Sequence, residues 1–177
     1  MLGSVLDSGS LSLHSTWSLR MSAFSKPTEQ QGRFYLWRFN DRLDRYREWN
    51  ITADEVAYSS IIEICEELIL HRFSHRTLTI SSPTSKIISV LGSIRRRLYY
   101  PQRLRIELLP HEHGISFEVD EPESMILFRA GYVVLTDWQR SLEGVLRNEG
   151  DFCMNIGGRR VWFWWYLDGY RRKDFNR

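Results

Sequence analysis

Apolar and polar residues alternate in short stretches along most of the chain after residue 32, which is the pattern of half-buried β-strands. Several of these stretches are rich in β-branched and aromatic residues. The pattern predicts strands at residues 34–39, 77–81, 104–109, 115–119, 125–128, 152–156 and 160–167. The intervening residues 40–50 are charged and aromatic, and we interpret them as a short helix or a loop.

A second pattern places apolar residues three and four positions apart, and it predicts three helices. The first helix covers residues 53–72, and Thr52 and Glu55 have the spacing of a capping box at its start. The second helix is expected to have Ser82 as its N-cap and Pro83 as its first residue, where a proline costs nothing.

The apolar face of the second helix is expected to continue as far as Leu98. In the third helix, Thr136 and Gln139 have the spacing of another capping box, followed by an apolar stripe. Gly150 is placed to end that helix in a left-handed conformation.

Runs of strands separated by single helices predict an α+β fold, a mostly antiparallel sheet with about three helices packed on it. The first predicted strand, helix and strand are compatible with a parallel crossover. The link at residues 111–114 is short enough to join strands 104–109 and 115–119 as a hairpin.

The length of 177 residues fits one domain. We expect residues 1–32, which are rich in serine and show no period, to be a disordered tail before a single domain at residues 33–177. No apolar run reaches the ~18 residues needed to cross a bilayer, so we expect a soluble protein with no membrane contact. Cys65 and Cys153 have no metal-ligand spacing, and a reducing, cytoplasmic compartment is expected.

The usual catalytic motifs for serine hydrolases, zinc proteases and phosphate-binding loops do not occur in the sequence. Gly157 and Gly158 precede a predicted strand, so they indicate a turn. Asp120, Glu121 and Glu123 could act as paired carboxylates, but their proline-containing loop favours a solvated acidic edge. We therefore expect no catalytic residues and no cofactor.

Two pairs of histidines suggest a metal site only if the fold brings the pairs together. His71 and His75 lie four residues apart at the end of the first helix, and His111 and His113 share one face of an extended segment. Zinc could bind them if they converged. Histidine at a helix C-terminus also favours the helix dipole without any metal, so we expect no metal.

A nucleic-acid-binding function is the alternative that the sequence leaves open. Arginines and tyrosines alternate near the end of the second helix, where phosphates would contact guanidinium groups and unstacked bases would contact the rings. Against this, the net charge is only +2. The residues of this hypothesis are Arg95, Arg96, Arg97, Tyr99, Tyr100, Arg103 and Arg105.

The last predicted strand is apolar on both faces. Residues 161–167 read VWFWWYL, so a strand exposed on one side would place Trp162, Trp164 and Tyr166 in water. Either the strand is covered twice or one face is a contact surface. Tryptophan is enriched among the residues that dominate interface energies, which supports the second interpretation.

Residues 77–106 carry six cations and no anion and form a basic block, whereas residues 107–125 carry six anions and no cation and form an acidic block. The acidic block is suited to meeting a basic partner surface. If the two blocks lie on neighbouring strands, they could instead neutralise each other. Our hypothesis is a non-catalytic protein-binding domain, an inhibitor or immunity-type partner, with self-association possible. The proposed contact residues are Glu112, Glu118, Asp120, Glu121, Glu123, Trp162, Trp164 and Tyr166.

Overall fold

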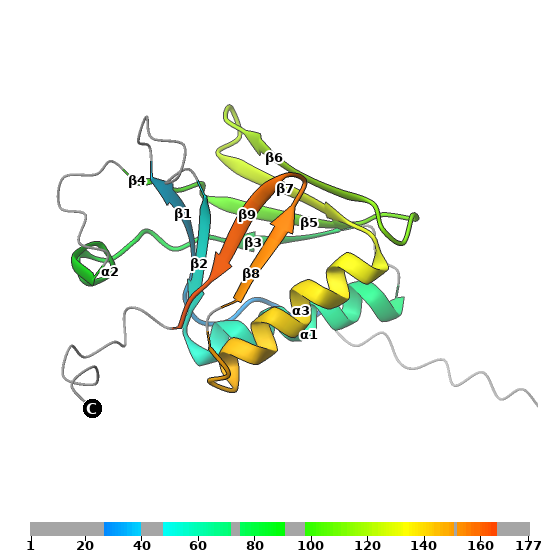
Figure 1. Ribbon diagram of the computed structural model, residues 1–177, viewed down its shortest axis with the longest axis horizontal. Coiled ribbons are helices and arrows are strands. Elements are labelled where there is room, and N and C mark those ends of the chain that lie inside the picture. Colours follow the sequence, from blue (N-terminus) through cyan, green and yellow to red (C-terminus); the bar gives the residue numbers. More distant parts are fainter. Residues whose placement is uncertain (1–26, 40–47, 72–74, 91–97, 151, 166–177) are drawn as a thin grey trace, which may run out of the picture.

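The structure, a computed structural model, describes residues 27–39, 48–71, 75–90, 98–150 and 152–165 (Figure 1). One sheet has five strands, in the spatial order β4 (Leu98–Tyr99), β1 (Phe34–Phe39), β2 (Trp49–Ala53), β9 (Arg159–Phe163) and β8 (Phe152–Ile156). The other has four, in the order β3 (His75–Thr79), β5 (Arg103–Leu108), β7 (Met125–Ala130) and β6 (Ile115–Asp120). The helices are α1 (Glu55–His71), α2 (Ser85–Val90) and α3 (Tyr132–Leu146).

The α+β class and the mostly antiparallel pairing are confirmed, but the expected single sheet is wrong. The β2–β9 and β5–β7 pairs are parallel, and the other strand pairs are antiparallel. The side chains on the inner face of each sheet need apolar contacts, and the inner face of the other sheet provides these contacts. The strands therefore form two packed sheets. None of the described helices is long and apolar enough to cross a membrane.

The main core lies between the two sheets and is closed by α1 and α3, which run side by side below them (Figure 1). Trp138 of α3 joins the sheets, because its ring centroid lies 4.6 Å from that of Phe128 and 5.0 Å from that of Phe163. Trp49 of β2 makes a second connection, 5.6 Å from the ring of Phe117. Both sheets and both helices therefore share one core.

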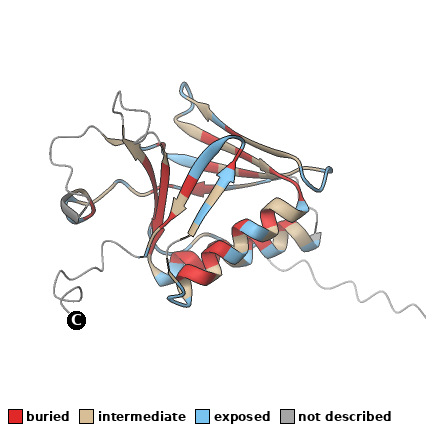
Figure 2. Cartoon of the chain, viewed as in Figure 1, coloured by how far each residue is buried: buried red, intermediate tan, exposed pale blue. Residues whose placement is uncertain are grey.

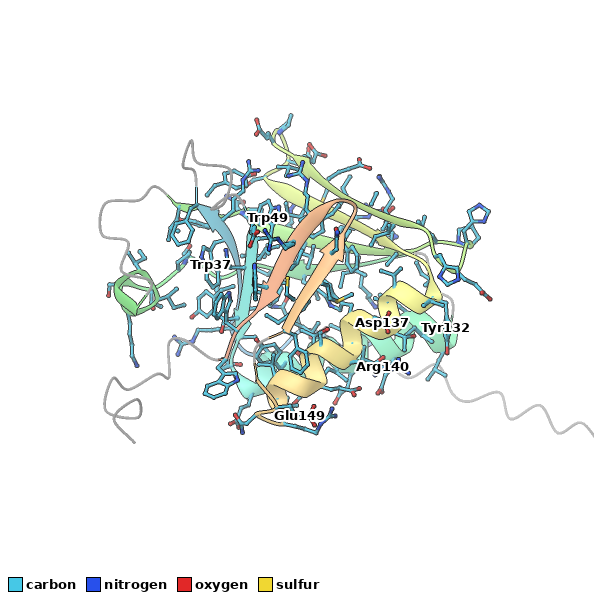
Figure 3. All side chains as sticks on the ribbon, in the orientation of Figure 1. Trp37, Trp49, Tyr132, Asp137, Arg140 and Glu149 are labelled. Atoms are coloured by element: carbon cyan, nitrogen blue, oxygen red, sulfur yellow. The ribbon has the colours of Figure 1, made fainter. Side chains whose placement is uncertain are left out.

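A second, smaller core covers the outer face of the five-stranded sheet. Tyr35 and Trp37 of β1 are fully buried there with Ile87 of α2, and Leu98 and Trp164 pack against them. Because β1 is covered on both faces, it is buried along most of its length (Figure 2). On the solvent side of α3, by contrast, Tyr132, Asp137 and Arg140 follow one another along the helix (Figure 3).

The expected cap of the first helix is wrong. Thr52 lies in β2, and Asp54 caps α1 instead, since its Oδ1 accepts a hydrogen bond from the Ala57 N–H at 2.8 Å. Asp also belongs to the strongly preferred N-cap residues. The side-chain hydroxyl of Thr52 donates to the backbone carbonyl of Trp165, so this threonine joins β2 to the chain after β9.

The second helix begins later and is shorter than expected. Thr84 caps it, since its Oγ1 accepts a hydrogen bond from the Ile87 N–H at 3.2 Å. Pro83 therefore precedes the cap. Leu98 is in β4 rather than on the helix, and the residues between 90 and 98 lie outside the described part of the chain.

The third helix begins a turn before the expected cap. Thr136 is already helical, and its hydroxyl donates to the Tyr132 carbonyl at 2.9 Å. The helix ends at Leu146, and Asn148, with φ 58°, takes the left-handed position after it that we expected for Gly150. The N–H groups of Asn148 and Glu149 donate to the carbonyls of Val145 and Gly144, which is the double hydrogen bond of a Schellman motif.

Two expected connections are wrong. β1 and β3 lie in different sheets, so no parallel crossover joins them. β5 pairs with β7 in parallel and β6 lies beyond β7, so the link at 111–114 is no hairpin.

The final pair of strands is confirmed, and its turn at Gly157 and Gly158 has φ angles of 58° and 78°. The β2 strand had been missed.

Residues before β1 contact the domain. The Thr28 hydroxyl donates to Glu67 Oε1 at 2.6 Å. The side-chain amide of Gln30 bonds to the carbonyl of Thr79 at 2.9 Å and accepts from its N–H at 2.6 Å, so it occupies the free edge of β3. Residues 1–26 of the expected tail lie outside the described residues.

Candidate protein-binding site

The β6–β7 hairpin carries most of the acidic residues singled out in the sequence. Its turn is held by the Ser124 N–H, which donates to the Glu121 carbonyl at 3.1 Å, and Ser124 has φ 48°. A shallow, open depression lies at this end of the hairpin. It is lined by Glu118, Val119, Asp120, Glu121, Pro122 and Leu127.

The carboxylates of the hairpin differ in their partners. Glu118 Oε1 accepts a hydrogen bond from Arg129 at 2.9 Å, and Glu123 accepts one from Arg103 at 2.9 Å. The nearby Ser116 hydroxyl and the Arg129 guanidinium lower the pKa of Glu118. Asp120 and Glu121 form no ion pair with any residue in the described ranges.

Glu112 is separated from the other acidic residues. It lies exposed in the β5–β6 link, and its backbone carbonyl accepts a hydrogen bond from the Val133 N–H at the start of α3. This link precedes β6, whereas the depression lies where β6 ends, so the strand separates Glu112 from Asp120. The five acidic residues therefore do not form one surface.

The basic and acidic blocks meet on the outer face of the four-stranded sheet. The Glu107 carboxylate lies between two cations, 2.8 Å from Arg105 Nε and 2.9 Å from Arg129 Nε. Arg129 also reaches Glu118, so the contacts continue from β5 across β7 to β6. This arrangement agrees with the interpretation that the two blocks neutralise each other.

The described part of the arginine–tyrosine segment does not form an open basic surface. The Arg38 guanidinium lies 4.8 Å from the ring centroid of Tyr99, whose ring also packs edge-on against Trp49. Burial is the largest influence on the pKa of Tyr99 and raises it. Arg103 and Arg105 have acidic partners, and Tyr100 is exposed. The remaining residues, Arg95, Arg96 and Arg97, lie outside the described ranges.

The tryptophans of the last strand lie on the outer face of the five-stranded sheet. Trp162 and Trp164 are partly buried and stack with ring centroids 5.8 Å apart. The Trp162 indole N–H donates to the Glu48 carboxylate, which also lies 2.6 Å from Arg160. Val161 and Phe163 point the other way, into the main core, whereas Tyr166 lies outside the described residues.

The chain matches no protein-family model, no curated protein and no solved structure.

The structure brings together no metal site within the part of the chain that it describes, where no group of three or more potential ligands occurs. His111 and His113 are exposed in the β5–β6 link, and His75 is exposed on β3. The side chain of His71 lies outside the described residues.

The sequence analysis missed Glu48 and Asn50, which hold the indole groups of the tryptophans. Glu48 directly precedes β2, and Asn50 lies in it. The sequence analysis interpreted residues 40–50 as a short helix or a loop. The available signal was the alternation of Trp49, Ile51 and Ala53 with polar residues. Leu127, which lines the depression between acidic residues, was likewise read only as a strand residue.

Proposed function

We propose that this chain is a non-catalytic protein-binding domain that receives a basic segment of a partner protein at the β6–β7 hairpin. The observation that carries the proposal is the depression in which Asp120 and Glu121 lie beside Leu127 and Pro122. Neither carboxylate has a cation partner among the described residues, whereas Glu118 next to them is already paired with arginine.

The residue types of this depression suit a lysine or arginine side chain. Such a side chain lays its aliphatic stem on an apolar surface and keeps its charged group at the rim. Leu127 and Pro122 would contact the stem, while Asp120 and Glu121 would accept charge-assisted hydrogen bonds from the cation. Charges at an exposed rim chiefly increase the association rate and exclude acidic partners.

An inhibitor or immunity-type role is the more specific form of this proposal. It requires a partner enzyme whose basic surface meets the hairpin and whose activity falls on binding. The neutralised outer face around Glu107 supports a protein partner over a nucleic acid, because Arg105 and Arg129 already contact carboxylates.

The test uses fluorescein-labelled decapeptides that differ only in carrying Lys and Arg, Glu, or Ser at their charged positions. We expect anisotropy to report binding of the basic peptide by the wild-type chain, weakening with added salt. The double variant Asp120→Asn/Glu121→Gln should bind at least about tenfold more weakly, the equivalent of one charge-assisted hydrogen bond. Glu112→Gln, which removes an exposed carboxylate at the other end of β6, is the matched control and should bind normally.

Equal binding of all three peptides, or an unchanged affinity in the double variant, would overturn the proposal. The same titration with single-stranded and duplex oligonucleotides tests the alternative. Salt-sensitive oligonucleotide binding in place of peptide binding would favour the nucleic-acid function through the arginine–tyrosine segment.

A further inference from the structure

The exposed edges of the two sheets differ in how they are protected. Sheet edges usually carry charges, prolines, bulges or a covering segment, because unpaired backbone groups otherwise pair with another chain. Gln30 occupies the β3 edge with two hydrogen bonds to Thr79. On the β6 edge, Glu118 and Asp120 supply charge, and Gly157 lies against the backbone of Ser116.

Apart from its end at the Gly157 turn, which lies beside β6, the β8 strand has none of these devices. Its sequence is FCMNI, with no charge, no proline and no glycine, and it pairs with β9 alone. Cys153 and Asn155 are exposed on the outer face of the sheet, while Phe152 and Met154 are only partly buried against the main core. The strand therefore presents apolar side chains and unprotected backbone at the same edge.

The register identifies which backbone groups face outward. The two-residue turn at Gly157 and Gly158 makes Ile156 and Arg159 the hydrogen-bonded closing pair. Hydrogen-bonded and non-hydrogen-bonded pairs alternate along an antiparallel ladder, so the N–H and C=O groups of Cys153 and Asn155 point away from β9. These groups have no backbone partner within the described part of the chain.

We propose that two copies of this chain associate through β8, which pairs antiparallel with β8 of the second copy. With the two-fold axis at Met154, Cys153 of each copy lies opposite Asn155 of the other, and all the outward backbone groups are satisfied. The two five-stranded sheets then become one continuous sheet across the axis.

Charge argues for a second copy as the occupant of this edge. Self-pairing places a strand against an identical strand, so any charge on it would face a like charge. β8 has no charge, and the nearby Arg160 is paired with Glu48. β6, in contrast, would bring Glu118 and Asp120 against their own copies. The interface goes beyond the proposed binding of a basic segment and does not use the β6–β7 hairpin.

The first experiment is sedimentation velocity of the full chain from low to high micromolar concentration. We expect a monomer–dimer equilibrium that Asn155→Lys shifts toward the monomer at least tenfold, because it places two like charges at the interface. Asn155→Pro, which removes an outward N–H that has no partner in the monomer, should act in the same direction. Asp137→Lys on the exposed side of α3 is the matched control and should leave the equilibrium unchanged.

The second experiment reads the geometry with a short bismaleimide crosslinker. In the proposed register the two Cys153 side chains are diagonal neighbours, about 7–8 Å apart. We expect a Cys153–Cys153 crosslink by mass spectrometry, since Cys65 is buried. A wild-type chain that stays monomeric throughout the concentration range, or a dimer without this crosslink, would refute the proposal. Peptide binding by Asn155→Lys should persist, so the proposed function and the dimer can fail separately.

Discussion

Asn50 Oδ1 accepts a hydrogen bond from the Trp164 indole N–H at 3.0 Å, between β2 and the residue that follows β9. The same asparagine donates from its side chain to the Glu48 carbonyl at 2.9 Å. The Trp164 backbone N–H also donates to the Ile51 carbonyl at 2.8 Å. These contacts orient an aromatic side chain that packs against the small core around Trp37.

Removal of this hydrogen bond should destabilise the fold. Asn50 is buried, so Asn50→Ala leaves the Trp164 indole N–H without its acceptor and should lower the free energy of unfolding by about 1–3 kcal/mol. Urea unfolding of the wild type, Asn50→Ala, Trp164→Phe and the double variant forms a mutant cycle. The expected coupling is about 1 kcal/mol, and additive effects would contradict the assigned bond.

Gly144 of α3 is expected to resist substitution even by a better helix former. A Cβ at this position would lie 2.3 Å from the Phe152 ring of β8, so Gly144→Ala should cost about 1–3 kcal/mol of overpacking despite the higher helix propensity of alanine. Thermal unfolding measures the loss. Phe152→Leu, introduced with Gly144→Ala, should restore part of it, whereas a stabilised single variant would show that the helix and strand lie farther apart.

The contact between Glu67 and Thr28 predicts a pH dependence. Hydrogen bonds from the Thr28 hydroxyl and N–H, together with Arg76, lower the pKa of Glu67 in the folded chain. A lowered folded pKa contributes stability that is present above the unfolded-state value of about 4.3 and is lost as the pH falls through the folded value. Glu67→Gln should therefore destabilise the chain at pH 7 and have less effect at pH 3.

The control for this pH dependence is Glu63→Gln, which removes an exposed carboxylate from the same helix. Urea unfolding should show that its effect on stability is small at both pH values. A Glu67→Gln effect that stays equal from pH 7 to pH 3 would contradict the assigned role of the Thr28 contact.

The two cysteines should differ in reactivity. Burial raises the pKa of Cys65 to about 12, whereas Cys153 is exposed. Because the thiolate is the reactive form, Ellman's reagent at pH 8 should modify one thiol per native chain, and the second only after unfolding. Burial and Glu48 also raise the pKa of Cys153, so we expect this thiol to react more slowly than free cysteine. Rapid modification of both would indicate an open core at Cys65.

Local sequence patterns were most informative where they depend on a single helix or strand. The 3.6-residue period of α1 predicted its existence and its buried face, because that face packs against a continuous core. The helix starts were less predictable. Asp54 and Thr52 are both acceptable N-cap residues, and the choice was decided by the pairing of Thr52 into β2.

The candidate site was predicted in part. The acidic residues were visible in the sequence, but the pairing of Glu118 with Arg129 depends on β6 lying beside β7. The pairing of Glu123 with Arg103 depends on β5 lying on the other side of β7. Only these strand pairings distinguish Glu118 and Glu123, which have cation partners, from Asp120 and Glu121. The interpretation of the Trp strand was also incomplete, because the acceptors for its indole groups come from residues 48–50.

By itself, the sequence determined most of the helical and extended segments, β2 and β4 excepted, and the apolar face of the helices, since these properties depend on neighbours a few residues apart. Only the tertiary structure decided that the strands form two sheets, that β5 pairs with β7, and that β8 lies at an edge. Pairing joins residues far apart in the chain, and alternating apolar residues satisfy many registers and partners equally well. The packing of both sheets around Trp138 selects among them.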